Sequence, residues 1–152
     1  ERLSAVLGLH REWPMAIVGV GHIGTALSRY TGRVERGFVL RALFDVDPDL
    51  IGTTLEGVRI DPISALEAVC RREGIQLAIL TVPAQGAQEM ADRRVAAGVR
   101  ALLNIAPVTL SLPAGISVRH VDITVELRLL SYMLIAEGGV GPAPATAWKD
   151  DD

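Results

Sequence analysis

The sequence predicts an α/β protein with an open parallel sheet and helices on both faces. Apolar stretches that are typical of strands alternate with stretches of helical period, and short loops join them. The first strand-like stretch ends in glycines spaced G-x-G-x-x-G, a pattern typical of a turn from a strand into a helix. Residues 77–81 are apolar without alternation, as expected for a parallel strand buried on both faces. Together these observations favour a Rossmann-like fold.

Length and composition indicate one globular domain with an aliphatic core. Of the 152 residues, 49% are apolar and 4% are aromatic, and the net charge is −3. This charge gives no electrostatic signature of nucleic-acid binding, and no apolar run is long enough to cross a bilayer. The single cysteine, Cys70, excludes an internal disulfide and favours a reducing, cytoplasmic compartment. Its register with Ile63 and Leu66 predicts a buried side chain rather than a redox thiol.

The pattern predicts each element in turn. Strands are expected at residues 15–18, 38–44, 58–60, 77–81, 99–105 and 116–120, and helices at 22–30, 62–73, 85–97 and 122–135. Asp61 is the expected N-cap of the second helix and Pro62 its first residue. The three histidines, His10, His22 and His120, have no metal-ligand spacing, so we expect no metal site.

Both ends of the chain are expected to lie outside the dinucleotide-binding domain of residues 14–121. The chain has no initiator Met, and apolar residues at helical spacing favour residues 1–13 as the remnant of a linker helix from a missing N-terminal domain. The helix at 122–135 is apolar nearly all round, which predicts burial on several sides and hence an interface with a second copy. Residues 136–152 are rich in Gly, Pro and Ala and are expected to be a disordered tail.

The glycine-rich turn is the strongest functional signal. Gly19 is expected to make the sharp turn, Gly21 to let the backbone approach a pyrophosphate, and Gly24 to let the helix pack closely on the sheet. Asp45 ends the second strand, 21 residues after Gly24, where the fingerprint expects an acidic residue that binds the adenosine ribose. Its charge would repel a 2′-phosphate and so favour NAD over NADP. The alternative is an Asx turn that leads into residues 47–48.

The other candidate residues follow from the fold. Right-handed crossovers place the carboxyl ends of the parallel strands at one edge, where ligands bind. Residues 81–83 and 104–107 follow two of these strands, and they offer no pair of groups suited to acid–base catalysis. We therefore expect no enzymatic turnover.

Two further residues have alternative interpretations. Tyr30 lies on the Ile23 and Leu27 face of the first helix, where core packing is the default and contact with a cofactor or a partner chain is the alternative. Asp122 is either the N-cap of the last helix or a contact near a nicotinamide ring.

Several segments together resemble the Rex family of redox-sensing transcriptional repressors over about residues 1–135. The segments are residues 7–13, 16–24, 44–48, 78–83, 103–107, 121–122 and 130–132. The resemblance implies a homodimer that binds NADH or NAD⁺ and represses respiratory and fermentative genes when NADH is low. It also implies a C-terminal helix swapped onto the partner subunit. Operator DNA would be bound only through a winged-helix domain that precedes the dinucleotide domain.

Mapped by motif, the resemblance also implies roles for single residues. The pyrophosphate would be held by the glycine-rich turn, the adenosine by the end of the second strand, and the nicotinamide by the two later segments. Tyr30 and Asp122 match positions that couple the nicotinamide state to domain orientation. The full cofactor-binding set is Gly19, Val20, Gly21, His22, Ile23, Gly24, Asp45, Val46, Thr81, Val82, Pro83, Asn104, Ala106, Pro107, Tyr30 and Asp122.

The leading interpretation is thus an NAD(H)-sensing domain of a repressor, with NADH and NAD⁺ as its ligands. One alternative is a fragment of a small NAD-dependent oxidoreductase. Another is a domain that binds coenzyme A or another adenine nucleotide, since one fold supports several ligands.

Overall fold

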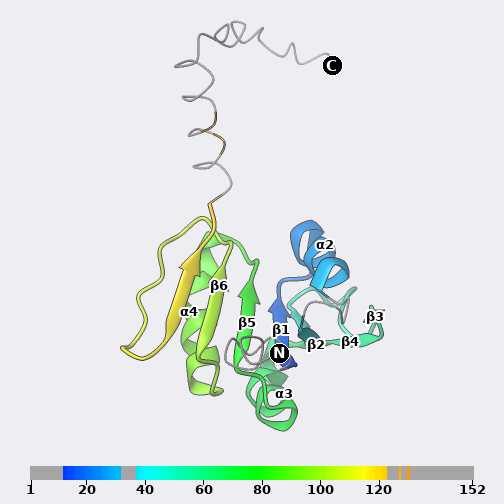
Figure 1. The fold of residues 1–152 in the computed structure, drawn as a ribbon. Coiled ribbons are helices and arrows are strands. Elements are labelled where there is room, and N and C mark those ends of the chain that lie inside the picture. The colour runs from blue at the N-terminus through cyan, green and yellow to red at the C-terminus, as the bar shows by residue number, and fades with distance from the viewer. Residues whose placement is uncertain (1–11, 32–36, 123–126, 128–129, 131–152) are drawn as a thin grey trace, which may run out of the picture. The chain divides into compact units, whose positions relative to one another are not determined.

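The computed structural model describes residues 12–31, 37–122, 127 and 130 (Figure 1). The chain divides into two compact units, Glu1–Val121 and Asp122–Asp152, and the sheet lies in the first. The predictions for residues 1–11, for the loop at 32–36 and for most of residues 122–152 fall outside the described residues.

The first unit is a seven-stranded, mostly parallel sheet in the order β3-β4-β2-β1-β5-β6-β7. Only the β3–β4 pair is antiparallel. This confirms the predicted Rossmann-like class (Figure 1). The elements are β1 (Trp13–Val18), α2 (His22–Thr31), β2 (Phe38–Asp45), β3 (Thr54–Leu55), β4 (Val58–Pro62), the 3-10 turn η2 (Ile63–Ala65), α3 (Leu66–Glu73), β5 (Leu77–Leu80), α4 (Ala84–Ala96), β6 (Ala101–Asn104) and β7 (Ser117–His120).

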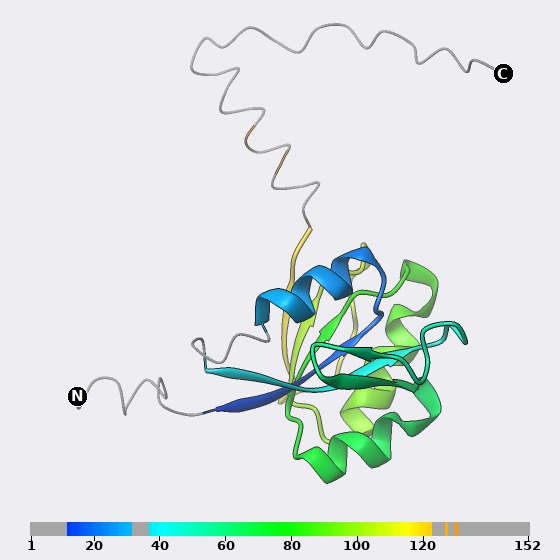
Figure 2. The same cartoon turned by 90° about the vertical axis from the view of Figure 1, so that its right-hand side faces the viewer.

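The helices cover the two faces of the sheet unequally. Helix α2 connects β1 to β2, which is the neighbour of β1 on one side within the sheet. Helices α3 and α4 lead to β5 and β6, which lie on the other side of β1 in the strand order. Because such crossovers are right-handed, α2 lies on one face and α3 and α4 on the other (Figure 2). Side chains of β1 alternate between the two cores: Ala16 and Val18 pack on the α3/α4 side, and Met15 and Ile17 on the α2 side.

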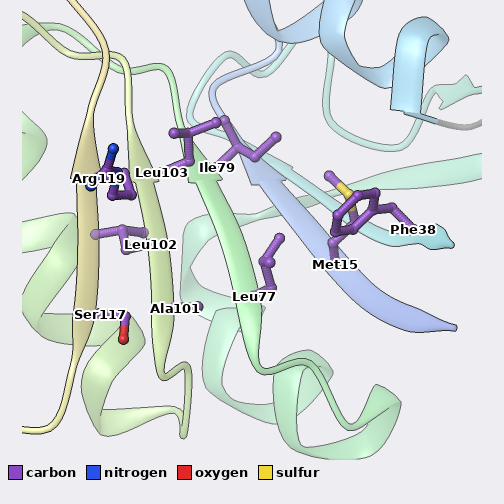
Figure 3. A pocket seen from close by; sticks show the side chains of 9 residues that line it. All are labelled: Met15, Phe38, Leu77, Ile79, Ala101, Leu102, Leu103, Ser117 and Arg119. Atoms are coloured by element: carbon purple, nitrogen blue, oxygen red, sulfur yellow. The ribbon is translucent and has the colours of Figure 1, made fainter. Parts of the chain in front are cut away.

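On the α2 side, no helix among the described residues covers β5, β6 and β7. An apolar groove of ≈ 330 Å³ lies there, and Figure 3 shows the side chains that line it. The link from β6 to β7 contains no helix that could cover this half of the sheet. The groove residues are Met15, Phe38, Leu77, Ile79, Ala101, Leu102, Leu103, Ser117 and Arg119.

The predicted N-cap at Asp61 and the helix start at Pro62 are wrong. Pairing with β2 carries β4 on to Pro62, opposite Asp45, and the 3-10 turn then precedes α3, which begins at Leu66. Extending the parallel ladder outweighs the local capping preference of an Asp-Pro pair. The hairpin that joins β3 to β4 is also absent from the prediction. The other element ends differ from the predicted ones by at most two residues.

Cys70 is buried on α3, as predicted, with 2% of its surface exposed. Burial raises the pKa of its thiol, although the charge of Arg94 opposes this effect. The thiol is therefore protonated near neutral pH and acts as a small apolar side chain. Among the described residues, no helix is both long and apolar enough to cross a membrane.

Candidate functional site

The candidate site lies where the chain leaves the central strands. β1 lies between β2 and β5, and the loops after β1 and β5 run to helices on opposite faces of the sheet. Such a divergence opens a crevice at the carboxyl edge of the sheet. The Thr81 N–H donates to the Val18 carbonyl at 2.9 Å, so the two loops start side by side.

The three glycines of the turn have different surroundings. Gly19 has φ +94°, and a Cβ there would lie 2.7 Å from Thr81 Oγ1 and 2.8 Å from its carbonyl oxygen. A Cβ at Gly24 would overlap the Gly19 carbonyl oxygen, whereas one at Gly21 would meet nothing within 4 Å. Gly19 and Gly24 are thus required by close packing within the protein. Gly21 leaves open space at the surface, as expected where a ligand approaches the backbone.

Asp45 lies against this loop and accepts three backbone hydrogen bonds. Its Oδ2 accepts from the Val20 N–H at 2.6 Å, and its Oδ1 accepts from the N–H groups of Val46 and Asp47 at 2.7 and 2.9 Å. The bond to Asp47 is the Asx turn that the sequence left as an alternative, and it coexists with the bond to the loop. The structure therefore brings together the two halves of the fingerprint. Val46, beside them, is 76% exposed.

A groove of ≈ 440 Å³ runs from the glycine-rich loop along the start of α2. Val20, Gly21 and His22 line it, together with three residues that sequence reasoning missed: Thr25, Ala26 and Arg29. The first turn of a helix leaves N–H groups without intrahelical acceptors and carries a partial positive charge. The groove is therefore suited to an anionic ligand. The helical period of residues 22–30 could have predicted these three residues, because positions 22, 25, 26 and 29 lie on the same face of a helix.

The residues after β5 and β6 serve partly to hold the backbone. Thr81 Oγ1 donates to the Gly19 carbonyl at 2.6 Å and lies 3.2 Å from the Val18 carbonyl oxygen. The Asn104 side chain is fully buried, donates to the Val108 carbonyl at 2.7 Å and accepts from the Ala106 N–H at 3.0 Å. Asn104 thus shapes a turn, and Pro107 in that turn is exposed. Val82 is partly buried and Pro83 is exposed at the start of α4.

Of the remaining candidate residues, Ile23 belongs to the glycine-rich turn, whereas Tyr30 and Asp122 lie apart from it. Ile23 and Tyr30 are 49% and 56% exposed, so the default prediction that Tyr30 packs in the core is wrong within this chain. Tyr30 is eight residues beyond His22, or about 12 Å along the helix axis. Asp122 begins the second unit and is exposed. Within the described parts of the chain, no cluster of three or more His, Cys, Asp or Glu residues could hold a metal ion.

Comparison with known proteins identifies the family. The model of the CoA-binding domain family matches residues 10–108, which is more than half of the chain. The chain belongs to the CoA-binding domain family. Within it, the chain is 44% identical over 134 residues to the redox-sensing transcriptional repressor Rex of Roseiflexus sp. (strain RS-1), and the match covers 88% of this chain and 61% of the relative. The chain therefore spans about three fifths of that relative, and the resemblance to Rex is confirmed.

Solved structures of a Rex-family repressor agree with this assignment. RSP, a Rex-family repressor, has been solved in complex with NADH, and that structure matches 90% of this chain with a TM-score of 0.82 and 33% identity. A second structure of RSP, with NAD⁺ and operator DNA, matches with a TM-score of 0.83 at the same identity. This chain covers 66% and 63% of those two chains. The relatives reported above are named as repressors rather than as enzymes.

Proposed function

We propose that this chain is the NAD(H)-binding, redox-sensing part of a transcriptional repressor. The observation that carries the proposal is that the Asp45 carboxylate meets the glycine-rich loop beside the open space at Gly21. A carboxylate has about four lone-pair positions, so three backbone bonds leave it able to accept from a ribose hydroxyl. The Rex relatives, and the complexes of RSP with NADH and NAD⁺, support the same ligand.

In this proposal the chain binds the cofactor without turning it over. The pyrophosphate lies at the start of α2, and the nicotinamide lies near residues 81–83 and 106–107. Of these side chains only Thr81 carries a hydroxyl, and that hydroxyl donates to the Gly19 carbonyl. A hydride-transfer enzyme needs a positioned acid–base group, which these residues do not supply. The oxidoreductase alternative is therefore disfavoured.

Coenzyme A is the second candidate, because the matching family is the CoA-binding domain family. The two ligands differ at the adenosine ribose, which has free hydroxyls in NAD and a phosphate in coenzyme A. A carboxylate at the position of Asp45 attracts the hydroxyls and repels the phosphate. The geometry of the site therefore favours NAD(H) over coenzyme A.

Calorimetric titration of the purified chain with NADH, NAD⁺ and coenzyme A tests the proposal. We expect NADH and NAD⁺ to bind with different affinities and coenzyme A to bind more weakly than either. Equal affinities for NADH and NAD⁺ would exclude sensing, since a ligand shifts an equilibrium only by its differential affinity. Steady consumption of NADH with small carbonyl compounds would instead support the oxidoreductase.

We further propose a homodimer formed through residues 122–135 of each copy, with each helix swapped onto its partner. The helix predicted at residues 122–135 is apolar nearly all round, and the groove over β5, β6 and β7 is apolar too. Both surfaces are therefore expected to be buried against a second copy of the chain. Leu127 and Leu130, which the structure describes, are 61% and 57% exposed. Sedimentation of the wild-type chain should give a dimer, and the double variant Leu127→Asp, Leu130→Asp should give a monomer. A variant that remains dimeric would exclude this interface.

Binding of operator DNA is proposed for the full-length repressor and not for these residues alone. The chain has a net charge of −3, and the Rex relatives are longer than the matched region. Coupling to the DNA-binding part is proposed to pass through Tyr30 and Asp122. An electrophoretic shift assay with a Rex operator should show no complex with this chain, and a specific complex would contradict the assignment.

A further inference from the structure

Arg119 is the one charged side chain among the described residues that line the apolar groove over β5, β6 and β7. It is exposed on β7, which forms the edge of the sheet beyond β6. In the strand register Arg119 lies opposite Leu103 of β6, and the same row continues through Ile79 of β5 to Ile17 of β1. Arg119 therefore ends a row of side chains that is otherwise apolar (Figure 3).

A cation at this position needs an anionic partner once the groove is covered. Among the described residues, none forms an ion pair with Arg119. Water solvates the guanidinium while the groove is open. Burial against a second copy would remove that water, and a buried charge is costly unless it is paired. The segment that covers the groove is therefore expected to carry a carboxylate at the matching position.

The segment proposed as the cover, residues 122–135, has a carboxylate within an apolar face. Leu130 has helical backbone in the structure. On a helix, Glu126 shares one face with Ile123, three residues before it, and with Leu130, four residues after it. Asp122 is the other acidic residue of the segment and is its expected N-cap. The groove and this helix face are thus alike, since each has apolar residues around one charge, and the two charges are opposite.

We propose that Arg119 of each copy forms an ion pair with Glu126 of the partner subunit. The occupant of the groove is thus a second copy of this chain, and the ion pair fixes the register of its helix. Apolar packing is non-directional and by itself selects no register. A helix shifted by one turn would leave both charges buried and unpaired, which disfavours that arrangement. This inference rests on the proposed homodimer and names the residues that select one form of it.

Protection of the sheet edge is the alternative role for Arg119. Charged side chains on an edge strand hinder its pairing with strands of other molecules. That role needs no carboxylate at residue 126, and Arg119→Glu would preserve it. The two roles therefore differ in what happens when the charges are reversed.

The first experiment reverses each charge in the whole chain and measures the dimer dissociation constant by sedimentation equilibrium. Arg119→Glu and Glu126→Arg should each raise the constant about tenfold or more, because each brings two like charges together. The double variant with both reversals should return to within about threefold of the wild type. Arg41→Glu is the matched control, because Arg41 is exposed on β2 beside residues of α3, on the face away from the groove. It should leave the constant unchanged, and thermal unfolding by circular dichroism checks that every variant is folded.

The second experiment tests whether the ion pair joins two copies. Arg119→Glu and Glu126→Arg are purified separately, mixed in equal amounts and sedimented together. In a mixed dimer each reversed charge faces a charge of opposite sign on the other chain, so both ion pairs are restored. The mixture should therefore dimerise with nearly the wild-type constant, although neither variant does so alone. A pair within one chain would not be restored by mixing, because each chain would still hold two like charges.

The outcomes separate this inference from the proposals on which it rests. A wild-type dimer whose constant is the same in Arg119→Glu and Glu126→Arg would overturn the ion pair and leave the protection of the sheet edge. Recovery in the double variant without recovery in the mixture would overturn the contact between copies. A monomeric wild type would overturn the homodimer together with the ion pair, whereas the proposed binding of NADH is measured separately and would stand.

Discussion

The Asp45 carboxylate accepts a hydrogen bond from the Val20 N–H at 2.6 Å, so the residue expected to bind the ribose also holds the glycine-rich loop. This bond joins the end of β2 to the loop that follows β1. Loss of Asp45 should therefore affect both the ligand contact and the shape of the loop. The two effects can be separated by measuring binding and stability in the same variants.

Asp45→Ala should weaken NADH binding at least tenfold, which is about 1.4 kcal/mol. It should also lower the free energy of unfolding by about 1.5–3 kcal/mol, because three N–H groups lose a charged acceptor. Asp45→Asn should narrow the preference for NADH over NADPH, since it removes the charge that repels a 2′-phosphate. Calorimetry and urea unfolding measure these effects. Asp49→Ala, in the adjacent turn, is the control and should match the wild type.

The variants Gly21→Ala and Gly24→Ala should distinguish a glycine that leaves room for the ligand from one that close packing within the protein requires. A methyl group at Gly21 meets nothing in the protein, so stability should change by less than about 0.5 kcal/mol while NADH binding weakens at least tenfold. A methyl group at Gly24 overlaps the Gly19 carbonyl oxygen and should cost about 1–3 kcal/mol of stability. Thermal unfolding and NADH titration of both variants test this. Equal stability losses would show that Gly21 is a packing residue as well.

Thr81→Val should disturb the loop without changing the shape of the side chain. The hydroxyl that donates to the Gly19 carbonyl at 2.6 Å is lost, which should cost about 1 kcal/mol of stability and weaken NADH binding three- to tenfold. Thr81→Ser keeps the donor and should bind like the wild type. If Thr81→Ser loses as much affinity as Thr81→Val, then the methyl group rather than the hydroxyl supports the loop.

Arg94→Met should stabilise the protein by about 1–4 kcal/mol. Arg94 is 1% exposed, and no described residue offers any of its three side-chain nitrogens a hydrogen-bond acceptor. A buried cation without a partner is costly, and a methionine of similar length fills the same space. Arg93→Met is the matched control on α4, because Arg93 is exposed with an ion pair to Glu89 at 3.0 Å, and its loss should change stability by less than about 0.5 kcal/mol.

The stability difference between Arg94→Met and the wild type should depend on pH, because Arg94 is buried. Burial lowers the pKa of Arg94 to about 9, with the buried Cys70 opposing the shift. Below about pH 9 the guanidinium is charged in both the folded and the unfolded chain, so the full penalty is present. Above about pH 9 the folded state binds fewer protons than the unfolded state, and stability contributed by this residue rises with pH. The advantage of Arg94→Met in urea unfolding should thus be constant from pH 6 to 8 and shrink above 9.

Much of the fold could be predicted because it depends on local periodicity. The strand at 77–81 and the helix at 22–30 follow from the spacing of apolar residues, and the structure has them within one residue. The start of α3 could not be predicted in this way, since the pairing of Pro62 with Asp45 is a contact between strands. The hydrogen bonds of Asn104 and His120 could not be predicted either, because their partners lie in an irregular turn without a periodic sequence pattern.

The amino-acid sequence by itself determined the class of fold, the glycine-rich turn and the acidic residue at the end of the second strand, because these depend on spacing along the chain. Tertiary structure alone decided that Asp45 holds the Val20 N–H, that Gly21 is the open glycine, and that half of one sheet face carries no described helix. The physical reason is that hydrogen-bond partners and free space are set by residues distant in sequence. They exist only once right-handed crossovers have placed the strands side by side.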